Sequence, residues 1–246
     1  MQLWNQIGSS IRNGFQSVQK YVDSSFHKSA LEELLSKNDD TDFNQIDQEG
    51  WFPIHRAIVL GNFEIFKKLL QKGANPNLKI KDVLSPLCKA IIEGKEQTVT
   101  FLIENGADVN MADGLDWTPI TKAIDTENIE ILKVLFENGA NPNFSQEGRN
   151  SPLNVAIYEG KKEIVTLLIE NGANVNFVDS LDWSPITMAV DTENVEILEI
   201  LIDKGGNLNT TIIGSPNWTQ LYLAIEFGNQ EIVRIMIENG AHVTVP

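Results

Sequence analysis

The side chains that could carry out catalysis are few in this chain, and they do not form a group. Its three histidines, His27, His55 and His242, are far apart in a sequence of 246 residues, so they are poorly placed to share a metal ion. No serine, histidine and aspartate fall into a pattern that would pair a nucleophile with its base. Neither G-x-x-x-x-G-K-S/T nor G-x-G-x-x-G is present. We therefore predict a non-enzymatic protein with no cofactor, no metal ion and no small-molecule substrate.

Carboxylates are the abundant charged group. The sequence has 34 acidic and 19 basic residues, and its net charge is −15. Affinity for nucleic acid comes from Lys and Arg that neutralise phosphates, so an acidic chain without a basic stripe argues against that partner. Calcium needs six or more oxygens that converge on one point, whereas the acids here are spread over separate loops. Two interpretations remain, a solvated surface or a surface that attracts a basic protein.

A short phrase that recurs along the chain indicates how these groups are positioned. It reads Gly-Ala-Asn-Pro-Asn at 73–77, and its glycines are Gly73, Gly106, Gly139, Gly172, Gly205 and Gly240, spaced by 33 residues four times and then by 35. A second phrase, Ser/Thr-Pro-Leu/Ile-x-x-Ala, recurs with the same 33-residue spacing. A fixed period of this length is typical of a solenoid, in which each unit stacks on its neighbours.

One unit, 113–145, illustrates the local structure. Thr118 is a suitable cap for a helix that begins at Pro119, where a missing N–H costs nothing. Apolar residues at helical spacing predict a second helix over 129–136. Two such helices carry more apolar residues than they could bury alone, so stacking supplies the missing burial. We predict six units, at 47–79, 80–112, 113–145, 146–178, 179–211 and 212–246.

The two phrases together resemble those of ankyrin-repeat proteins, over about residues 47–246. The resemblance implies an all-α solenoid of about six helix-turn-helix repeats, with finger loops that project to one side. It also implies a protein partner, bound by the finger tips and the concave helix face, and no catalysis. The histidine usual in the helix-start phrase is kept only as His55, which puts the usual hydrogen bonding between repeats in doubt. Glu127 and Glu193 replace the glycine usual between the two helices.

A second period, of 66 residues, distinguishes alternate repeats. Residues 85–143 and 151–209 are identical at 37 of 59 aligned positions. Tryptophan precedes the helix-start phrase in four repeats, at Trp51, Trp117, Trp183 and Trp218. Tryptophan is enriched among interface anchors, but each indole could equally pack against the loop of its neighbour.

The candidate partner-binding residues lie on the fingers and on the first helices. On the fingers they are the tryptophans with Leu115 and Leu181, and on the first helices they are Asp125, Tyr158, Glu159, Asp191, Glu226 and Phe227. Their carboxylates would complement a basic partner.

The two ends leave alternatives open. Residues 1–46 are predicted to form an N-terminal cap, in which 3–26 is an amphipathic helix that covers the first repeat, docks a partner or contacts a membrane surface. At the other end, apolar residues over 232–237 predict a face that is partly exposed, joins copies into an oligomer or continues into further chain. The single cysteine, Cys88, and the lack of a secretory signal favour the cytoplasm. The asparagine-rich repeats would also suit a bacterial effector delivered into a host cytoplasm, or a toxin-neutralising immunity protein.

Overall fold

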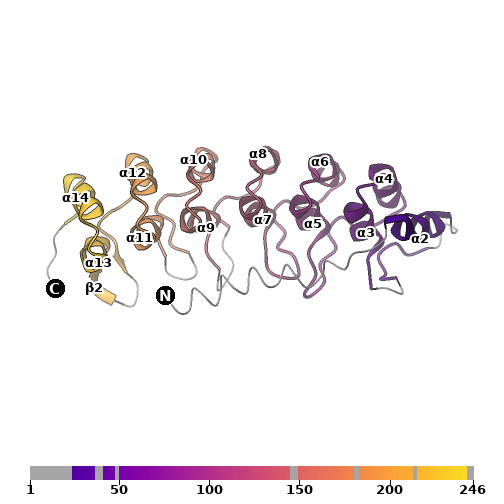
Figure 1. The fold of residues 1–246 in the computed structure, drawn as a ribbon, viewed down its shortest axis with the longest axis horizontal. Coiled ribbons are helices and arrows are strands. Elements are labelled where there is room, and N and C mark those ends of the chain that lie inside the picture. The colour runs from indigo at the N-terminus through magenta and orange to yellow at the C-terminus, as the bar shows by residue number, and fades with distance from the viewer. Residues whose placement is uncertain are drawn as a thin grey trace. The chain divides into compact units, whose positions relative to one another are not determined.

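The computed structural model describes residues 24–36, 41–47, 50–144, 149–179, 183–212 and 215–242. Within these ranges it contains thirteen helices and two short strands (Figure 1). The chain divides into two compact units, residues 1–75 and 76–246. The predicted all-α architecture of repeated helix pairs is confirmed.

Unit 1 contains α2 (Ser24–Ser36), α3 (Pro53–Leu60) and α4 (Phe63–Gln71). The chain turns between α3 and α4 at Gly61, whose φ of 70° lies in the left-handed region. Asn62 then caps α4 by accepting a hydrogen bond from the N–H of Ile65. α2 packs against both helices, as expected of a capping segment. The predicted amphipathic helix over 3–26 lies almost entirely outside the described residues.

Unit 2 repeats a helix pair five times (Figure 1). The first helices are α5 (Pro86–Ile92), α7 (Pro119–Asp125), α9 (Pro152–Tyr158), α11 (Pro185–Asp191) and α13 (Gln220–Phe227). The second helices are α6 (Glu96–Glu104), α8 (Ile129–Glu137), α10 (Lys162–Glu170), α12 (Val195–Asp203) and α14 (Gln230–Glu238). Each first helix packs against the first helix of the next pair, so the first helices form one row and the second helices another (Figure 1).

Local sequence explains where these helices begin. A serine or threonine precedes each first helix of unit 2, and its hydroxyl accepts a hydrogen bond from the backbone N–H three residues later. Proline follows this cap in four of the five helices, as predicted for Pro119. Aliphatic side chains then fill the space between pairs, and Ile124, Ile157, Leu132 and Val165 have no exposed surface.

The last asparagine of the recurring phrase links each repeat to the next. Asn110 Nδ2 donates a hydrogen bond to the carbonyl oxygen of Gly139 at 3.1 Å, and its Oδ1 accepts one from the N–H of Asn141 at 2.7 Å. The same two bonds recur in unit 2 at Asn77, Asn143, Asn176 and Asn209. One amide group, with its donor and its acceptor, thus satisfies two backbone groups of the following repeat. This bonding gives a physical reason for the recurrence of the phrase.

The two glutamates that replace glycine adopt a strained backbone conformation. Glu127 and Glu193 have φ values of 54° and 53°, which cost a residue with a side chain about 1 kcal/mol. Their carboxylates reach the next repeat, where Glu127 Oε1 lies 3.5 Å from Lys161 Nζ and Glu193 Oε2 accepts a hydrogen bond from Asn229 Nδ2 at 3.0 Å. The strain is therefore partly offset by a contact between repeats.

The last finger contains the two strands. β1 (Thr211–Ile212) and β2 (Ser215–Thr219) pair antiparallel, with an irregular register. The two residues beyond the usual 33-residue spacing fall in this segment, for which the sequence predicts a longer finger. Within the described residues, this small hairpin is the exception to the all-α architecture.

Candidate functional site

The C-terminal ends of the first helices bring four of the predicted residues to one repeated position. Asp125, Tyr158, Asp191 and Glu226 occupy equivalent places in α7, α9, α11 and α13, which pack against one another in that order. Glu159 and Phe227 directly follow two of them. These residues, Asp125, Tyr158, Glu159, Asp191, Glu226 and Phe227, are called the inner-helix surface below.

Two aromatic rings supply the apolar part of the inner-helix surface. Tyr158 is 42% exposed and Phe227 is 43% exposed. Scattered apolar residues are ordinary on a protein surface. These two, however, lie in a single row of helices and stand next to carboxylates, a combination that suits an interface.

Some carboxylates of this surface are already paired within the chain. Asp125 Oδ2 lies 3.7 Å from Lys122 Nζ, and Glu159 Oε2 lies 2.5 Å from Lys161 Nζ. The two lysines are largely buried, with side-chain exposures of 1% and 14%, so each pair compensates a positive charge that is mostly removed from water. Loss of either carboxylate would leave a largely buried lysine with fewer charge partners, so Asp125 and Glu159 also have a structural role.

Asp191 and Glu226 stand in different surroundings. In the repeat of Asp191, Met188 takes the place that Lys122 has beside Asp125. Asp191 is half-buried, and burial raises the pKa of its carboxyl group. The side chain of Glu226 is hydrogen-bonded to Tyr222, which raises the pKa of the tyrosine hydroxyl. A cation brought to Asp191 by a partner would favour its ionised form.

The finger tryptophans are held by the backbone of their own loops. In three fingers the aspartate four residues before the tryptophan accepts a hydrogen bond from the backbone N–H of that tryptophan, at 2.9–3.1 Å. The pairs are Asp47 with Trp51, Asp113 with Trp117 and Asp179 with Trp183. All three indoles are half-buried. Leu115 is 37% exposed. Leu181 and the side chain of Trp218 lie outside what the structure describes, so their predicted roles stay predictions.

Two of the chain's own cations lie over the indole of Trp117. Lys122 Nζ is 4.0 Å from the ring centroid, and Arg149 Cζ is 4.5 Å from it. Arg149 also donates a hydrogen bond to the carbonyl oxygen of Leu115 at 3.1 Å, which joins the finger of one repeat to the next. These contacts favour loop packing, one of the two interpretations left open by the sequence, for the Trp117 indole.

Replacing Trp117 with alanine is expected to lower the free energy of unfolding by about 2–3 kcal/mol, because a large half-buried ring and two cation–π contacts are lost. Urea denaturation followed by circular dichroism measures this change. Leu115→Ala in the same finger is the control and should change stability by less than about 1 kcal/mol, because that side chain is more exposed. Unchanged stability of the Trp117 variant, with partner binding lost, would show that the indole is an anchor instead.

A buried polar contact between repeats is a feature that sequence reasoning missed. Asn154, which stands at the usual histidine position, donates from Nδ2 to Asp179 Oδ2 and to the carbonyl oxygen of Trp183, both at 2.8 Å. Hydrogen bonding between these repeats is therefore present without histidine. The equivalent residue, Cys88, has weaker contacts, since its Sγ lies 3.8 Å from the carbonyl oxygen of Trp117 and its thiol is a weak donor to Asp113. The 66-residue alignment, which pairs Cys88 with Asn154, was the available indication.

The comparisons with known proteins agree with this geometry. A family model described as ankyrin repeats (3 copies) matches residues 20–80 and 153–246, and one described as ankyrin repeats (many copies) matches residues 87–136. The chain belongs to the ankyrin-repeat family. Among solved structures, the crystal structure of the human ASB11 ankyrin repeat domain aligns with a TM-score of 0.63 and 27% identity, covering 78% of this chain and 85% of that one. No curated protein matches the chain.

Ankyrin repeats are in general protein–protein interaction modules and are typically non-enzymatic. Among the described residues of this ankyrin-repeat protein, no group of three or more His, Cys, Asp or Glu side chains is placed to hold a metal ion. No described helix is long and apolar enough to cross a membrane.

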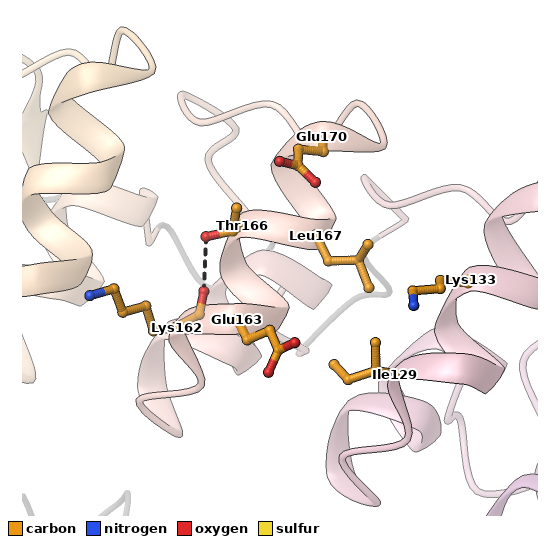
Figure 2. Close-up of a pocket in the computed structure, with 7 residues that line it drawn as sticks. All are labelled: Ile129, Lys133, Lys162, Glu163, Thr166, Leu167 and Glu170. Carbon is orange, nitrogen blue, oxygen red and sulfur yellow. Dashed lines mark hydrogen bonds between the residues drawn. The ribbon is translucent and has the colours of Figure 1, made fainter.

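A shallow depression of about 500 Å³ lies on the opposite row, between α8 and α10 (Figure 2). Ile129 and Leu167 give it an apolar part, and Glu163 and Glu170 line it as well. Its lysines already contact glutamates, since Lys133 Nζ lies 2.8 Å from Glu130 and Lys162 Nζ lies 2.9 Å from Glu196. Its lining residues do not converge on one point, so we assign no ligand to this depression.

Proposed function

We propose that this ankyrin-repeat protein binds a protein partner with a basic surface through the inner-helix surface and the adjoining fingers. The observation that carries the proposal is the alternation of exposed aromatic rings and carboxylates along one row of helices. Tyr158 and Phe227 would act as the apolar anchors, because large rings dominate binding energy at interfaces.

The charges support a basic partner. Asp191 and Glu226 lie at equivalent positions in neighbouring repeats, and a chain with a net charge of −15 attracts cationic surfaces over long range. Complementary charge of this kind mainly raises the association rate and selects the partner. The binding should therefore depend strongly on salt.

Affinity capture from the native cell extract tests the proposal. The wild-type chain is expected to retain a protein of basic isoelectric point, which elutes when salt rises from about 0.1 M to 0.5 M because the Debye length shortens. The doubly neutralised variant Asp191→Asn/Glu226→Gln should retain less of it at low salt. Equal capture by both chains, or elution that is independent of salt, would contradict a basic partner.

A further inference from the structure

An asparagine followed by glycine comes directly after the second helix in four of the five repeats of unit 2. These pairs are 105–106, 138–139, 171–172 and 239–240, and a fifth pair, 13–14, lies outside the described residues. An asparagine before glycine is especially prone to spontaneous deamidation, because glycine has no side chain to shield its backbone nitrogen. The repeat therefore places a chemically labile bond at the same position four times.

This reaction needs only water and has two steps. The glycine nitrogen loses its proton and attacks Cγ of the asparagine side chain, while the bond from Cγ to Nδ2 breaks and the departing amide nitrogen takes up a proton and leaves as ammonia. Water then opens the five-membered imide at either of its two carbonyl groups. The product is aspartate, or isoaspartate in which the main chain runs through Cγ. Each product adds one negative charge.

Hydrogen bonds in the folded chain hold both reacting groups away from this reaction. Asn138 Nδ2 donates to the carbonyl oxygen of Val134 at 2.8 Å, which directs the side chain back along α8 and away from the next residue. The N–H of Gly139 donates to the carbonyl oxygen of Phe136 at 3.0 Å, so loss of its proton would sacrifice a hydrogen bond. Both bonds recur in the other three pairs, at 2.8 Å from the asparagine side chain and 3.0–3.1 Å from the glycine.

The preceding repeat adds a second restraint at each of the four pairs, because an asparagine side chain binds the glycine carbonyl oxygen. Asn110 binds the carbonyl oxygen of Gly139 and the N–H of Asn141, directly after the labile bond at Asn138. Asn143 makes the same two bonds in the next repeat. Closure of the imide ring turns this part of the backbone, so these bonds must break before the ring can form.

We propose that Asn105, Asn138, Asn171 and Asn239 are deamidation sites that the folded repeats protect, so that each modification marks a repeat that has opened. Opening of one repeat is expected in a solenoid, whose units contact only their neighbours. The modification is irreversible and favours further opening. It removes the Nδ2 donor and places a negative charge at the C-terminal end of a helix, where the helix dipole disfavours it.

Peptide mass spectrometry of the full chain, incubated in heavy-oxygen water, measures the modification at each pair, because only products formed during the incubation carry the label. In native buffer the four asparagines should react at least about 100-fold more slowly than in about 8 M urea at the same pH, which corresponds to an opening free energy of about 2.8 kcal/mol. Protection of less than about tenfold at these sites would overturn the proposal.

The chain itself supplies a control for the assignment of the sites. Lys72 and Lys204 stand at the equivalent place after α4 and α12, with φ values of −90° and −89°. Asn138→Lys should therefore fold, and it should lose the modification at this one position while the other three sites react as in the wild-type chain. Continued ammonia release from residues 138–139 of this variant would show that the sites are wrongly assigned.

Two reciprocal variants test whether the protection is local. Asn110→Ala should speed the modification of Asn138 about tenfold relative to that of Asn171, because two hydrogen bonds beside Asn138 are lost. Asn143→Ala should have the opposite effect and speed Asn171 about tenfold relative to Asn138. If both variants speed all four sites equally, the modification reports unfolding of the whole chain, and the proposal that it marks a single opened repeat is refuted.

Discussion

Truncating Tyr158 and Phe227 to alanine together is expected to weaken binding of the captured partner about 100-fold, since each aromatic anchor contributes roughly tenfold, or about 1.4 kcal/mol. Both rings are more than two-fifths exposed in the isolated chain, so removing them should change the stability of the unbound chain little. In a complex their apolar surface would be removed from water, and the alanine variants would forfeit that gain. Titration calorimetry with the captured partner measures the change.

The fold of this double variant should remain intact. Exposed substitutions usually alter stability by less than about 0.5 kcal/mol, so the urea midpoint should barely move. Ile46→Ala, which changes a 58% exposed apolar residue in unit 1, is the control and should bind like wild type. Binding that survives loss of both rings would locate the interface on the fingers or elsewhere.

Replacing Cys88 with asparagine is expected to stabilise the chain by about 1–2 kcal/mol, because it supplies a charge-assisted hydrogen bond to a buried carboxylate. Asp113 has no exposed surface, and its Oδ2 accepts no full hydrogen bond, having only the weak thiol donor of Cys88 beside it. In the related repeat, Asn154 donates to Asp179 Oδ2 at 2.8 Å. Asparagine at position 88 should reproduce that bond.

The exchange in the opposite direction is the matched control. Asn154→Cys removes the amide donor from Asp179 Oδ2, which keeps the N–H of Ser151 at 3.2 Å, and should destabilise the chain by about 2–3 kcal/mol, the cost of losing a hydrogen bond to a buried carboxylate. Urea denaturation of both variants measures the two effects. If Cys88→Asn destabilises the chain, the space around residue 88 does not admit the amide in the orientation that Asn154 adopts.

The effect of Cys88→Asn should also depend on pH. Burial raises the pKa of the Asp113 carboxyl group, so the folded chain keeps this proton to a higher pH than the unfolded chain does. The stability contributed by this group is therefore present below the ordinary aspartate pKa of about 3.9 and is lost as pH rises through the raised value. An amide donor favours the ionised carboxylate, so the gain should be larger at pH 7 than near pH 4. An equal gain at both pH values would show that the new side chain acts through packing.

Much of the helical architecture could be predicted from the sequence because its determinants are local. The caps at Ser85, Thr118 and Ser151, and the proline that follows each, fix where the first helices begin whatever their neighbours are. The 33-residue period adds the requirement that each helix pair stack on the next. The lengthened last finger was likewise visible as two extra residues, although its pairing into β1 and β2 was not.

The candidate site was only partly predictable. The sequence identified Tyr158 and Phe227 by their place on the first helices, but only the structure gives their exposure. It also marked Trp117 by its 66-residue recurrence, although Lys122 from the following helix α7 and Arg149 from the next repeat both lie over that ring. The contact of Arg149 depends on how two repeats meet, and a period in the sequence does not specify it.

The sequence by itself determined the family, the helix pairs and the repeat spacing, because capping, helical periodicity and nearest-neighbour stacking are encoded within one or two repeats. The tertiary structure decided which of the repeated positions are hydrogen-bonded and which are buried. Asn154 and Cys88 stand at the same place in the repeat, yet Asn154 donates to a buried aspartate, whereas Cys88 leaves Oδ2 of the equivalent aspartate, Asp113, without a full hydrogen bond. Val190 and Ile225 are also equivalent, yet one is buried and the other is half-exposed. The physical reason is the same in both cases, since a side chain's burial and bonding are set by the neighbour that packs on it.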